Sequence, residues 1–375
     1  MAGDYLMDEM QPSPVESLTK ILSDKGSMSV ADYMALSLTA AGVGYYKNGN
    51  PIGAKGDFVT APEVSQIFGE LIGIWVMIVW EGMGCPQNFI LAELGPGRGT
   101  LMQDVMRATR AKPAFRQAAR VHLVETSVTL REAQGKALRS LCRPEWHESF
   151  TALPEAPLII VANEFFDALP TEQFVYHGGS WYKRVLTLDD NNRPIFAAGR
   201  LEVPPVEILP DNMPNEGDIL EFCPAAVDLI GEIGRRARNA SCAILITDYG
   251  YDGRDYGDTL QAVSAHNYVD PIQPPGTVDL STHVNFAELR IAAQDAGLTP
   301  SRVMPQSEYL MSLGLEPRLR RLMADADEEQ RAALFLGARR LVDPFQMGSL
   351  FKAMAITSTH LPLPPPFSVE SRAIQ

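Results

Sequence analysis

The chain has 375 residues, of which 46% are hydrophobic, and its formal net charge at pH 7 is −14. This length suffices for one large or two medium-sized cores, and the acidic balance does not favour non-specific binding to nucleic acid or to an anionic membrane surface. Because of this charge we expect no nucleic-acid partner. The four cysteines lack C-x-x-C spacing and indicate neither a zinc site nor a disulfide framework, so we expect no metal.

Residues 1–85 are predicted to form a helical extension. The stretch "MAGDYLMDEMQPSPVESL" lacks the features of a signal or transit peptide, so we expect a cytoplasmic location. Ser29-x-x-Asp32 predicts a capping box, and a Gly-rich loop is expected over 44–63. The apolar segment 71–80 is too short to cross a bilayer and predicts a buried helix, so no membrane insertion is expected.

Residues 86–357 alternate between apolar runs of strand length and helix-period segments, which is typical of an α/β fold with a mostly parallel sheet. Helices are expected over 101–110 and after Thr126 or Ser127, either of which can cap the second one. Ligands bind at the carboxyl ends of the strands in such sheets. The expected strands are 88–93, 121–125, 146–150, 157–166, 242–251 and 349–357.

Two segments interrupt this alternation. Residues 173–222 contain aromatic and β-branched runs separated by "HGGS" and "DDNN", which predicts an inserted subdomain of antiparallel hairpins on the substrate side. Residues 305–345 predict charged amphipathic helices inserted before the last strand. The Pro-rich tail, 358–375, is expected to be extended.

The stretch "LAELGPGRGT" at 91–100 places three glycines directly after the first predicted strand. A P-loop would need a lysine, and Arg98-Gly99-Thr100 supplies none there. A dinucleotide-binding loop needs its third glycine one place later than Gly99. The remaining pattern, acid-x-G-x-G-x-G from Glu93 to Gly99, is that of class I methyltransferases that bind S-adenosylmethionine (SAM).

The chemistry of SAM agrees with this loop. Glycines permit close backbone approach to the nucleoside, and SAM has no pyrophosphate to neutralise. Glu93 suits the cationic amino-acid end, and Glu125, after the second strand, is placed to accept the ribose hydroxyls unless it is only a solvated strand end. His147 and Glu148 are candidates for the adenine side.

Acidic and amide side chains also crowd the end of the fourth strand, in "VANEFFDALPTEQF". A guanidinium stays protonated at neutral pH, so an arginine acceptor needs carboxylates that orient and polarise it. Glu164 and Glu172 resemble the paired glutamates of protein arginine methyltransferases. The alternative is that these acids cap the next turn or pair with Arg184. Asp248, Tyr249 and His266 are expected to line the acceptor pocket, although a structural histidine is the alternative for His266.

Five blocks in one order, "GDFVTAPEVSQIFGELIG", "LAELGPGRGT", "NEFFDALP", "ITDYGY" and "DPIQPPGTVDLSTHVNF", resemble the MidA-like methyltransferases, the family of the mitochondrial complex I assembly arginine methyltransferase. The resemblance runs from about Gly44 to Ala355, and its N-terminal block implies that Thr60, Pro62 and Glu63 lie beside a loop that acts as a lid over cofactor and substrate. It implies a class I, Rossmann-like fold with a mostly parallel seven-stranded sheet and SAM as cofactor. The acidic N-terminus departs from mitochondrial members and favours a bacterial-type, cytoplasmic one.

The resemblance also implies an activity and a partner. It implies dimethylation of an arginine of the NuoD-type subunit of NADH:quinone oxidoreductase (complex I) during assembly. The cofactor-binding candidates are Thr60, Pro62, Glu93, Gly95, Gly97, Gly99, Thr100, Glu125, His147, Glu148 and Asn163, and the catalytic candidates are Glu164, Asp167, Glu172, Asp248 and His266. A small-molecule methyltransferase and an assembly chaperone that keeps SAM as a structural ligand remain as alternatives, and a homodimer is left open.

Overall fold

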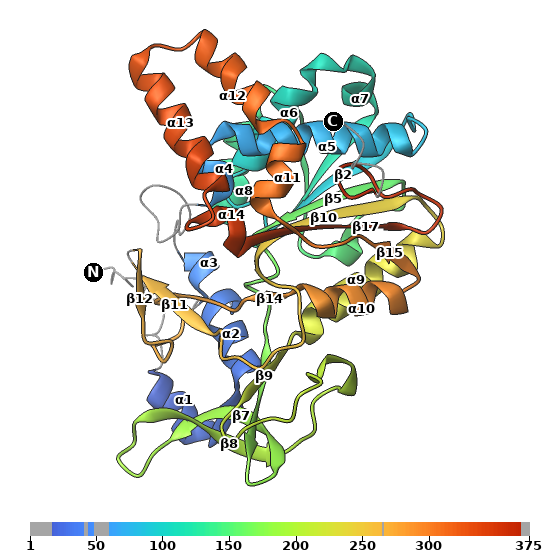
Figure 1. Cartoon of the computed structure of the whole chain (residues 1–375). Helices are drawn as coiled ribbons and strands as arrows, with labels where there is room; N and C mark the ends of the chain where they lie inside the picture. Colours follow the sequence, from blue (N-terminus) through green and yellow to red (C-terminus); the bar gives the residue numbers. More distant parts are fainter. Residues whose placement is uncertain (1–16, 41–43, 49–59, 265, 369–375) are drawn as a thin grey trace, which may run out of the picture.

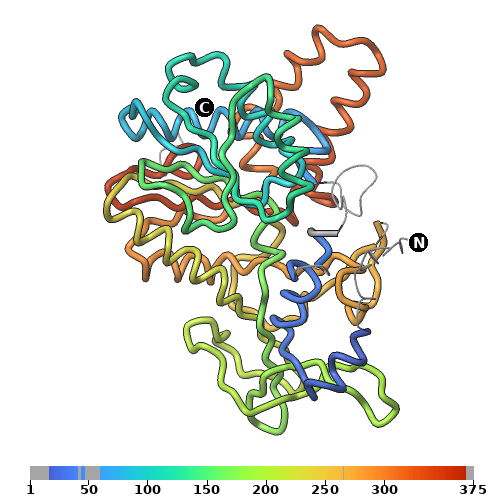
Figure 2. The backbone as a smooth tube through the Cα atoms, turned by 180° about the vertical axis from the view of Figure 1, so that it is seen from behind, coloured from blue at the N-terminus to red at the C-terminus, as the bar shows by residue number. Residues whose placement is uncertain are grey.

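The computed structural model describes residues 17–40, 44–48, 60–264 and 266–368. They form two parts, which Figure 1 shows one above the other. The larger part is a sheet with helices on both faces, and the smaller part holds a second sheet together with N-terminal helices. Figure 2 shows from behind that residues 172–222 lie beside these N-terminal helices, although the two segments are far apart in sequence.

The central sheet has the strand order β15-β17-β10-β5-β2-β3-β4, and the short strands β14 and β16 pair with β10 and β17. Its strands are β2 (Phe89–Leu94), β3 (Ala119–Val124), β4 (Glu145–His147), β5 (Leu158–Asn163), β10 (Cys242–Tyr251), β14 (Val284–Asn285), β15 (Leu298–Pro300), β16 (Met304–Pro305) and β17 (Phe351–Ser358). The strands from β10 to β4 are parallel, whereas β17 is antiparallel to β10 and β15. The fold is therefore α/β with a mixed sheet of nine strands, two more than expected, because the two short strands extend it.

Helices cover both faces of this sheet, as an α/β architecture requires. One face carries α5 (Gln66–Gly82), α6 (Thr100–Ala108), η1 (Thr109–Ala111), α7 (Pro113–Ala118) and α8 (Val128–Leu138), and the other carries α9 (Pro224–Ala237) and α10 (Phe286–Asp295). The strands β2 and β5 are buried at every position. Burial on both faces explains why these strands read as continuous apolar runs rather than alternating ones.

Helix α5 contains the apolar segment for which the sequence predicts a buried helix, and this prediction is confirmed. It begins after Ser65, whose hydroxyl accepts the N–H of Ile67 at 3.3 Å. A Cβ on Gly69 would lie 2.5 Å from the Cβ of Asp104, so the close packing of α5 on α6 requires glycine here. No helix in the described ranges is long and apolar enough to cross a membrane.

The helix caps agree with the sequence, except that Ser29 and Asp32 form only one of the two hydrogen bonds of the predicted capping box; the third strand also differs from its predicted bounds. The hydroxyl of Ser29 accepts the N–H of Asp32 at the start of α2 (Val30–Thr39), and Ser127, rather than Thr126, caps α8. Strand β4 spans 145–147 instead of 146–150, because the chain turns into the 3-10 helix η2 (Phe150–Ala152), which buries Phe150 against the sheet.

The smaller part contains a five-stranded sheet in the region expected to form hairpins. Its strands are β1 (Ser27–Ser29), β6 (Glu172–His177), β7 (Ser180–Leu188), β8 (Pro194–Leu201) and β9 (Ile219–Phe222), all paired antiparallel, with η3 (Val206–Ile208) beside them. Strand β1 comes from the N-terminal segment, between α1 (Leu18–Lys25) and α2. The N-terminal extension is therefore not purely helical, because β1 contributes an edge to the inserted sheet.

A third, three-stranded sheet connects the two parts. It consists of β11 (Gln261–Ser264), β12 (Asn267–Val269) and β13 (Asp279–Ser281). The helix α3 (Tyr45–Asn48) packs on α2, whereas α4 (Ala61–Val64) packs on α5, α6 and α13 (Glu328–Val342) of the larger part. Helix α2 packs on β13, with Tyr33 and Leu280 in a shared apolar cluster. Segments outside the central sheet thus build this side of the molecule.

The region 305–345 contains helices, as its amphipathic pattern suggests. They are α11 (Gln306–Ser312), α12 (Leu315–Ala324) and α13 (Glu328–Val342), followed by α14 (Met347–Leu350) before β17. Asp327 and Gln330 form a capping box at the start of α13. Within the part of the tail that the structure describes, Phe367 is buried and its ring stacks on Tyr309 at 5.4 Å, so this part folds back onto the helices.

Candidate active site

A cavity of about 410 Å³ opens at the carboxyl edge of the central sheet, where it meets α3 and β13. Ligands bind at this edge in open α/β sheets, close to the topological switch point of the strand order, which here lies at β2 and β5. The lining contains the carboxylates Glu125, Glu148, Glu164, Asp167 and Asp279. Among the described residues that line it, none is lysine, arginine or histidine.

The loop between β2 and α6 forms one wall of this cavity. Gly95, Gly97 and Gly99 all have positive φ, at 60°, 52° and 84°. A Cβ on Gly95 would lie 2.9 Å from the ring of Phe165, so a side chain there would collide with the opposite wall. The loop therefore presents bare backbone to the cavity, as close approach by a nucleoside requires.

Glu93 lies beneath this loop in a second, smaller cavity of about 50 Å³, which Thr60, Pro62, Thr100 and Asn163 also line. Its side chain is 3% exposed, and its Oε2 has no hydrogen-bond partner among the described residues. Burial raises the pKa of Glu93 to about 8, against the opposing effect of the Met102 N–H, and Glu125 adds repulsion. A buried carboxylate oxygen without a partner fits the ammonium group of SAM.

The hydroxyl of Thr100 is engaged within the protein. It donates to Oε1 of Glu63 at 2.6 Å, which fastens α4 to the start of α6. Thr60 lines both cavities and Pro62 lines the smaller one, so α4 borders the expected cofactor site. Most of the predicted lid loop, residues 49–59, lies outside the described residues.

Glu125, the predicted ribose acid, lines the larger cavity at the end of β3 and is 8% exposed. Its Oε1 accepts the N–H of Ser127 at 2.8 Å, and its Oε2 accepts Nε2 of Gln134 at 3.2 Å. The same Gln134 amide donates to the carbonyl of Gly97 at 2.7 Å. Gln134, which the sequence reasoning missed, thus ties the glycine loop to the ribose acid.

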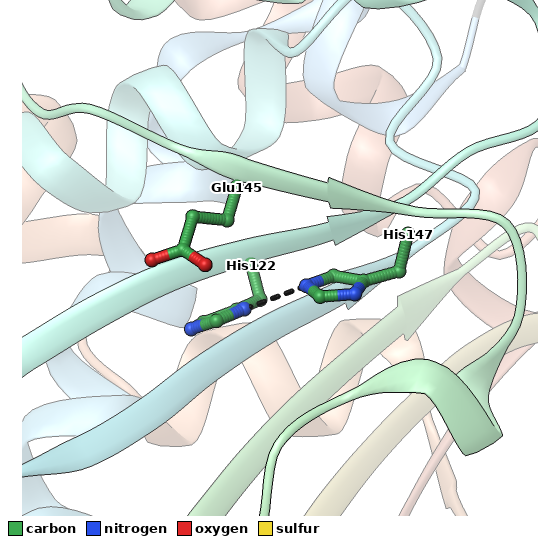
Figure 3. Close-up of side chains that lie close together, drawn as sticks. All are labelled: His122, Glu145 and His147. Carbon is green, nitrogen blue, oxygen red and sulfur yellow. Dashed lines mark hydrogen bonds between the residues drawn. The ribbon is translucent and has the colours of Figure 1, made fainter.

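Of the two adenine-side candidates, Glu148 lines the cavity, whereas His147 is turned toward His122 on β3 (Figure 3). Nδ1 of His122 and Nε2 of His147 lie 2.8 Å apart in a hydrogen bond. His147 still has a structural link to the site, because its carbonyl accepts the N–H of Glu125 at 2.9 Å. The structure does not place the His147 ring in the cavity, as the prediction for the adenine side required. Side chains alternate between the two faces of a strand, and the ring of His147 lies on the same face of the sheet as that of His122.

Glu145 lies next to this histidine pair, and potential metal-ligand atoms of the three residues are within 4.8 Å of one another. The two nitrogens that face each other already form a hydrogen bond, and burial lowers the pKa of His122. The buried Nε2 of His122 has no partner among the described residues. The nitrogen lone pair between His122 and His147 therefore accepts a hydrogen bond within the protein and is not directed at a metal position shared by the three residues.

Glu164 follows β5 and lines both cavities. It has a positive φ of 49°, which is uncommon outside glycine and is typical of functional sites. Its Oε1 accepts the N–H of Ala61 at 2.9 Å and Nδ2 of Asn163 at 3.0 Å. Burial, reinforced by Asp167, raises the pKa of Glu164 to about 7.

Asp167 and Tyr249 line the same end of the larger cavity. Asp167 is 9% exposed, and its Oδ1 has no hydrogen-bond partner within 3.5 Å among the described residues. Burial raises the pKa of Asp167 to about 6, while the nearby Tyr249 hydroxyl opposes the shift. Asp167 therefore adds negative charge to this end of the cavity near neutral pH.

Asp248, expected to be catalytic, does not line either cavity. It is fully buried on β10, and its Oδ2 accepts the backbone N–H groups of Phe165, Phe166 and Asp167 at 3.0–3.3 Å. Burial raises the pKa of Asp248, and Asp167 and Glu164 add repulsion. It is a positioning residue, because it holds the turn that carries Glu164 and Asp167.

Two further catalytic candidates lie away from the cavity. Glu172 begins β6 and forms an ion pair with Lys183 at 2.8 Å, so strand pairing directs it into the smaller sheet rather than toward Glu164. His266 is exposed in the turn that connects β11 and β12. Neither belongs to the cavity lining, and the proposed pairing of Glu164 with Glu172 is not present.

Tyr46 and Asp279 line the larger cavity but were not predicted as site residues. Tyr46 lies on α3 and Asp279 begins β13, so neither follows a strand of the central sheet. Asp279 does fall within the block "DPIQPPGTVDLSTHVNF", which was the only signal in the sequence that could have identified it.

Comparison with known proteins agrees with this geometry. Residues 71–304 match the family described as "Putative S-adenosyl-L-methionine-dependent methyltransferase". The chain is 34% identical to the mitochondrial "Protein arginine methyltransferase NDUFAF7 homolog" of Drosophila melanogaster, over 90% of this chain and 83% of the relative. It is 33% identical to the human mitochondrial protein arginine methyltransferase NDUFAF7, over 94% and 87%.

A solved structure is also similar. The crystal structure of a Burkholderia thailandensis protein bound to S-adenosyl-homocysteine (SAH) matches with a TM-score of 0.76 and 25% identity, over 90% of this chain and 89% of that one. The glycine loop, the unpartnered Oε2 of Glu93 and the predicted ribose acid Glu125 fit the same ligand class. The chain therefore belongs to the family described as "Putative S-adenosyl-L-methionine-dependent methyltransferase" and is an S-adenosyl-L-methionine-dependent methyltransferase.

Proposed function

We propose that the protein methylates an arginine side chain of a partner protein. The observation that carries this proposal is the composition of the larger cavity, which has five carboxylates and, among the described lining residues, no basic side chain. Glu125 and Glu148 lie at the expected nucleoside end. Glu164, Asp167 and Asp279 line the rest of the cavity, and the two acids in the segment after β5, Glu164 and Asp167, favour a cationic acceptor.

The reaction makes few demands on acid–base groups. SAM supplies an activated methyl group, and the acceptor nitrogen must be held in line with it at near-contact distance. Glu164 and Asp167 would orient a guanidinium through charge-assisted hydrogen bonds. When the nitrogen–carbon bond forms and the carbon–sulfur bond breaks, one N–H proton leaves the nitrogen. The pKa of Glu164, about 7, suits it to receive that proton near neutral pH.

Four finer points rest on similarity. Relatives that align over most of the chain are named protein arginine methyltransferases, which supports a protein acceptor. The resemblance to the MidA-like family supports a complex I subunit of the NuoD type as the partner, dimethylation as the outcome and assembly as the purpose. A cytoplasmic location and a homodimer remain predictions.

The alternatives predict different fates for the methyl group. A small-molecule methyltransferase would label a metabolite, and an assembly chaperone would bind SAM without transfer. The acids at the acceptor end favour transfer to a cation, since a chaperone that uses SAM only as a structural ligand has no need for them.

Radiolabelled SAM, incubated with the protein and an extract of cells that lack it, tests these three functions. We expect label on an arginine of a protein, located by mass spectrometry. Label on a metabolite or on another residue type would overturn the arginine proposal. Binding of SAM by calorimetry without any transfer would support the chaperone instead.

A further inference from the structure

We propose that Gln134 and Trp146 are positioning residues for the cofactor. Trp146 sets the direction of the Gln134 amide, and this amide holds Glu125 and the glycine loop in the arrangement that binds SAM. Gln134 lies on α8, is fully buried and does not line the cavity. The inference takes Glu125 as the predicted ribose acid and does not depend on which acceptor is methylated.

Three hydrogen bonds fix the direction of the Gln134 amide. Its Oε1 accepts the Nε1–H of Trp146 at 2.8 Å, and its Nε2 donates to the Gly97 carbonyl at 2.7 Å and to Oε2 of Glu125 at 3.2 Å. An indole N–H can only donate and a carbonyl can only accept. Turning the amide over would set donor against donor and oxygen against oxygen, so a single orientation satisfies all of these groups.

Hydrogen-bond donors on both oxygens orient the Glu125 carboxylate. The Ser127 N–H binds Oε1 at 2.8 Å, and the Gln134 amide binds Oε2. Together they fix the plane of the carboxylate, which has about four acceptor positions and can therefore still accept from ribose hydroxyls. Burial raises the pKa of Glu125, whereas the Ser127 N–H and the Gln134 amide oppose this rise, so the amide also favours the ionised form that accepts both hydroxyls.

The same amide fixes the position of the glycine loop. Gly97, whose carbonyl accepts the amide, lines both cavities. Helix α8 approaches this loop closely, because a Cβ on Gly99 would lie 3.2 Å from the Cα of Gln134. One buried side chain therefore contacts both the loop and the predicted ribose acid, and it sets the distance between these two parts of the cofactor site.

Calorimetric titration of the full-length protein with SAH at pH 6 and pH 8 tests this role. Gln134→Glu keeps the shape of the side chain but turns an acceptor toward the Glu125 carboxylate, so we expect SAH affinity relative to wild type to fall about 100-fold at pH 8. Burial beside Glu125 raises the pKa of the introduced carboxyl group. At pH 6 it is protonated and can donate again, and the loss should shrink to about tenfold.

Two further variants separate the amide from its charge and from its orientation. Gln134→Met removes the amide without adding a charge, so we expect a loss of about tenfold that is equal at both pH values. Trp146→Phe keeps an aromatic ring but removes the N–H that orients the amide, and the loss should be smaller, about threefold.

The ribose supplies a readout that a purely structural role would not change. Wild type should bind SAH more tightly than its 2′-deoxy analogue, because Glu125 accepts from both hydroxyls. Gln134→Met should reduce this preference, since the carboxylate is no longer aligned with the ribose. A side chain that only supports the fold would weaken the binding of both ligands by the same factor.

Gln306→Glu is the matched control. Gln306 is fully buried on α11, lines neither cavity, and its Nε2 also donates to a backbone carbonyl, that of Leu341, at 2.9 Å. We expect this variant to keep wild-type SAH affinity at both pH values, and the melting temperature of each variant reports any folding defect.

The inference is overturned by unchanged SAH affinity in Gln134→Met, or by a loss in Gln134→Glu that is equal at pH 6 and pH 8. A loss in Gln306→Glu as large as that in Gln134→Glu would also overturn it. If Gln134→Glu does not fold, Gln134→Met and its preference for the ribose hydroxyls decide the question: an unreduced preference contradicts the positioning role.

Discussion

Glu164 is the residue on which the proposed chemistry depends most. It combines a positive φ, a position between the two cavities and a pKa raised to about 7 by burial. We expect Glu164→Gln to lower kcat by roughly 100-fold or more, the range typical of a lost catalytic carboxylate. The amide oxygen can still accept the N–H of Ala61, so SAH affinity measured by calorimetry should change little.

The pH profile adds a second readout for Glu164. Since the ionised carboxylate is the active form, wild-type kcat should rise as the pH increases through about 7, and Glu164→Gln should lose this rise. Glu221→Gln, which removes a buried acid from a small pocket separate from both of these cavities, is the matched control. Full activity of Glu164→Gln would show that the orienting role belongs to another group.

Single residues differ in how far the sequence reveals them. Glu93 and Gly95 are predictable because strand and loop place them at fixed spacing on a single local motif. Asp248 was mistaken for a cavity residue, since its sequence position does not show that its carboxylate accepts three turn N–H groups. Tyr46 and Asp279 are 233 residues apart, and only the tertiary fold brings them together.

At the scale of elements, the glycine loop between β2 and α6 controls the cofactor site. Gly97 has a φ of 52°, a conformation that a β-branched residue adopts only with strain. We expect Gly97→Val to lower SAH affinity, measured by calorimetry, by roughly 100-fold or more, because a displaced loop also loses the contact of Gln134 with the Gly97 carbonyl.

A matched glycine separates local strain from loss of the site. Gly178 in the turn between β6 and β7 has a φ of 56°, and an added Cβ there meets nothing within 4 Å. Gly178→Val should therefore cost about 1–2 kcal/mol of stability without changing SAH affinity. If both variants lost SAH binding equally, the loop would have no special role.

The strands of the central sheet were largely predictable from the sequence, whereas elements outside that sheet, such as β1, were not. Strands such as β2 and β5 are buried on both faces and leave an apolar run in the sequence. Strand β1 has three residues and pairs with β7, more than 150 positions away, so no local pattern reveals it. The proposed cofactor site is therefore encoded locally, whereas the proposed acceptor site depends on long-range packing.

For the whole molecule, buried acids determine how stability depends on pH. Burial raises the pKa of Glu93 and Glu288 to about 8, of Asp104 and Glu164 to about 7, and of Asp167 to about 6. Between the ordinary carboxyl pKa and these values the folded state binds more protons than the unfolded state. The stabilising contribution of each group is complete at low pH and is lost as the pH rises through its raised value.

We therefore expect the free energy of unfolding to fall as the pH rises from about 5 to 8, by up to about 1.4 kcal/mol per pH unit for each group that titrates. Burial lowers the pKa of His122 and His283, so these two residues make the free energy of unfolding rise with pH. Their effect ends near pH 6.5, the ordinary histidine pKa, and they are fewer than the buried acids. Denaturant unfolding at several pH values measures this slope. Glu288→Gln should flatten it, and SAH should flatten it between pH 7 and 8 by supplying a cation to Glu93. If the free energy of unfolding is constant or increases from pH 6 to 8, these carboxyl groups are ionised in the folded protein. The acidic cavity would then need a bound cation even before the acceptor binds.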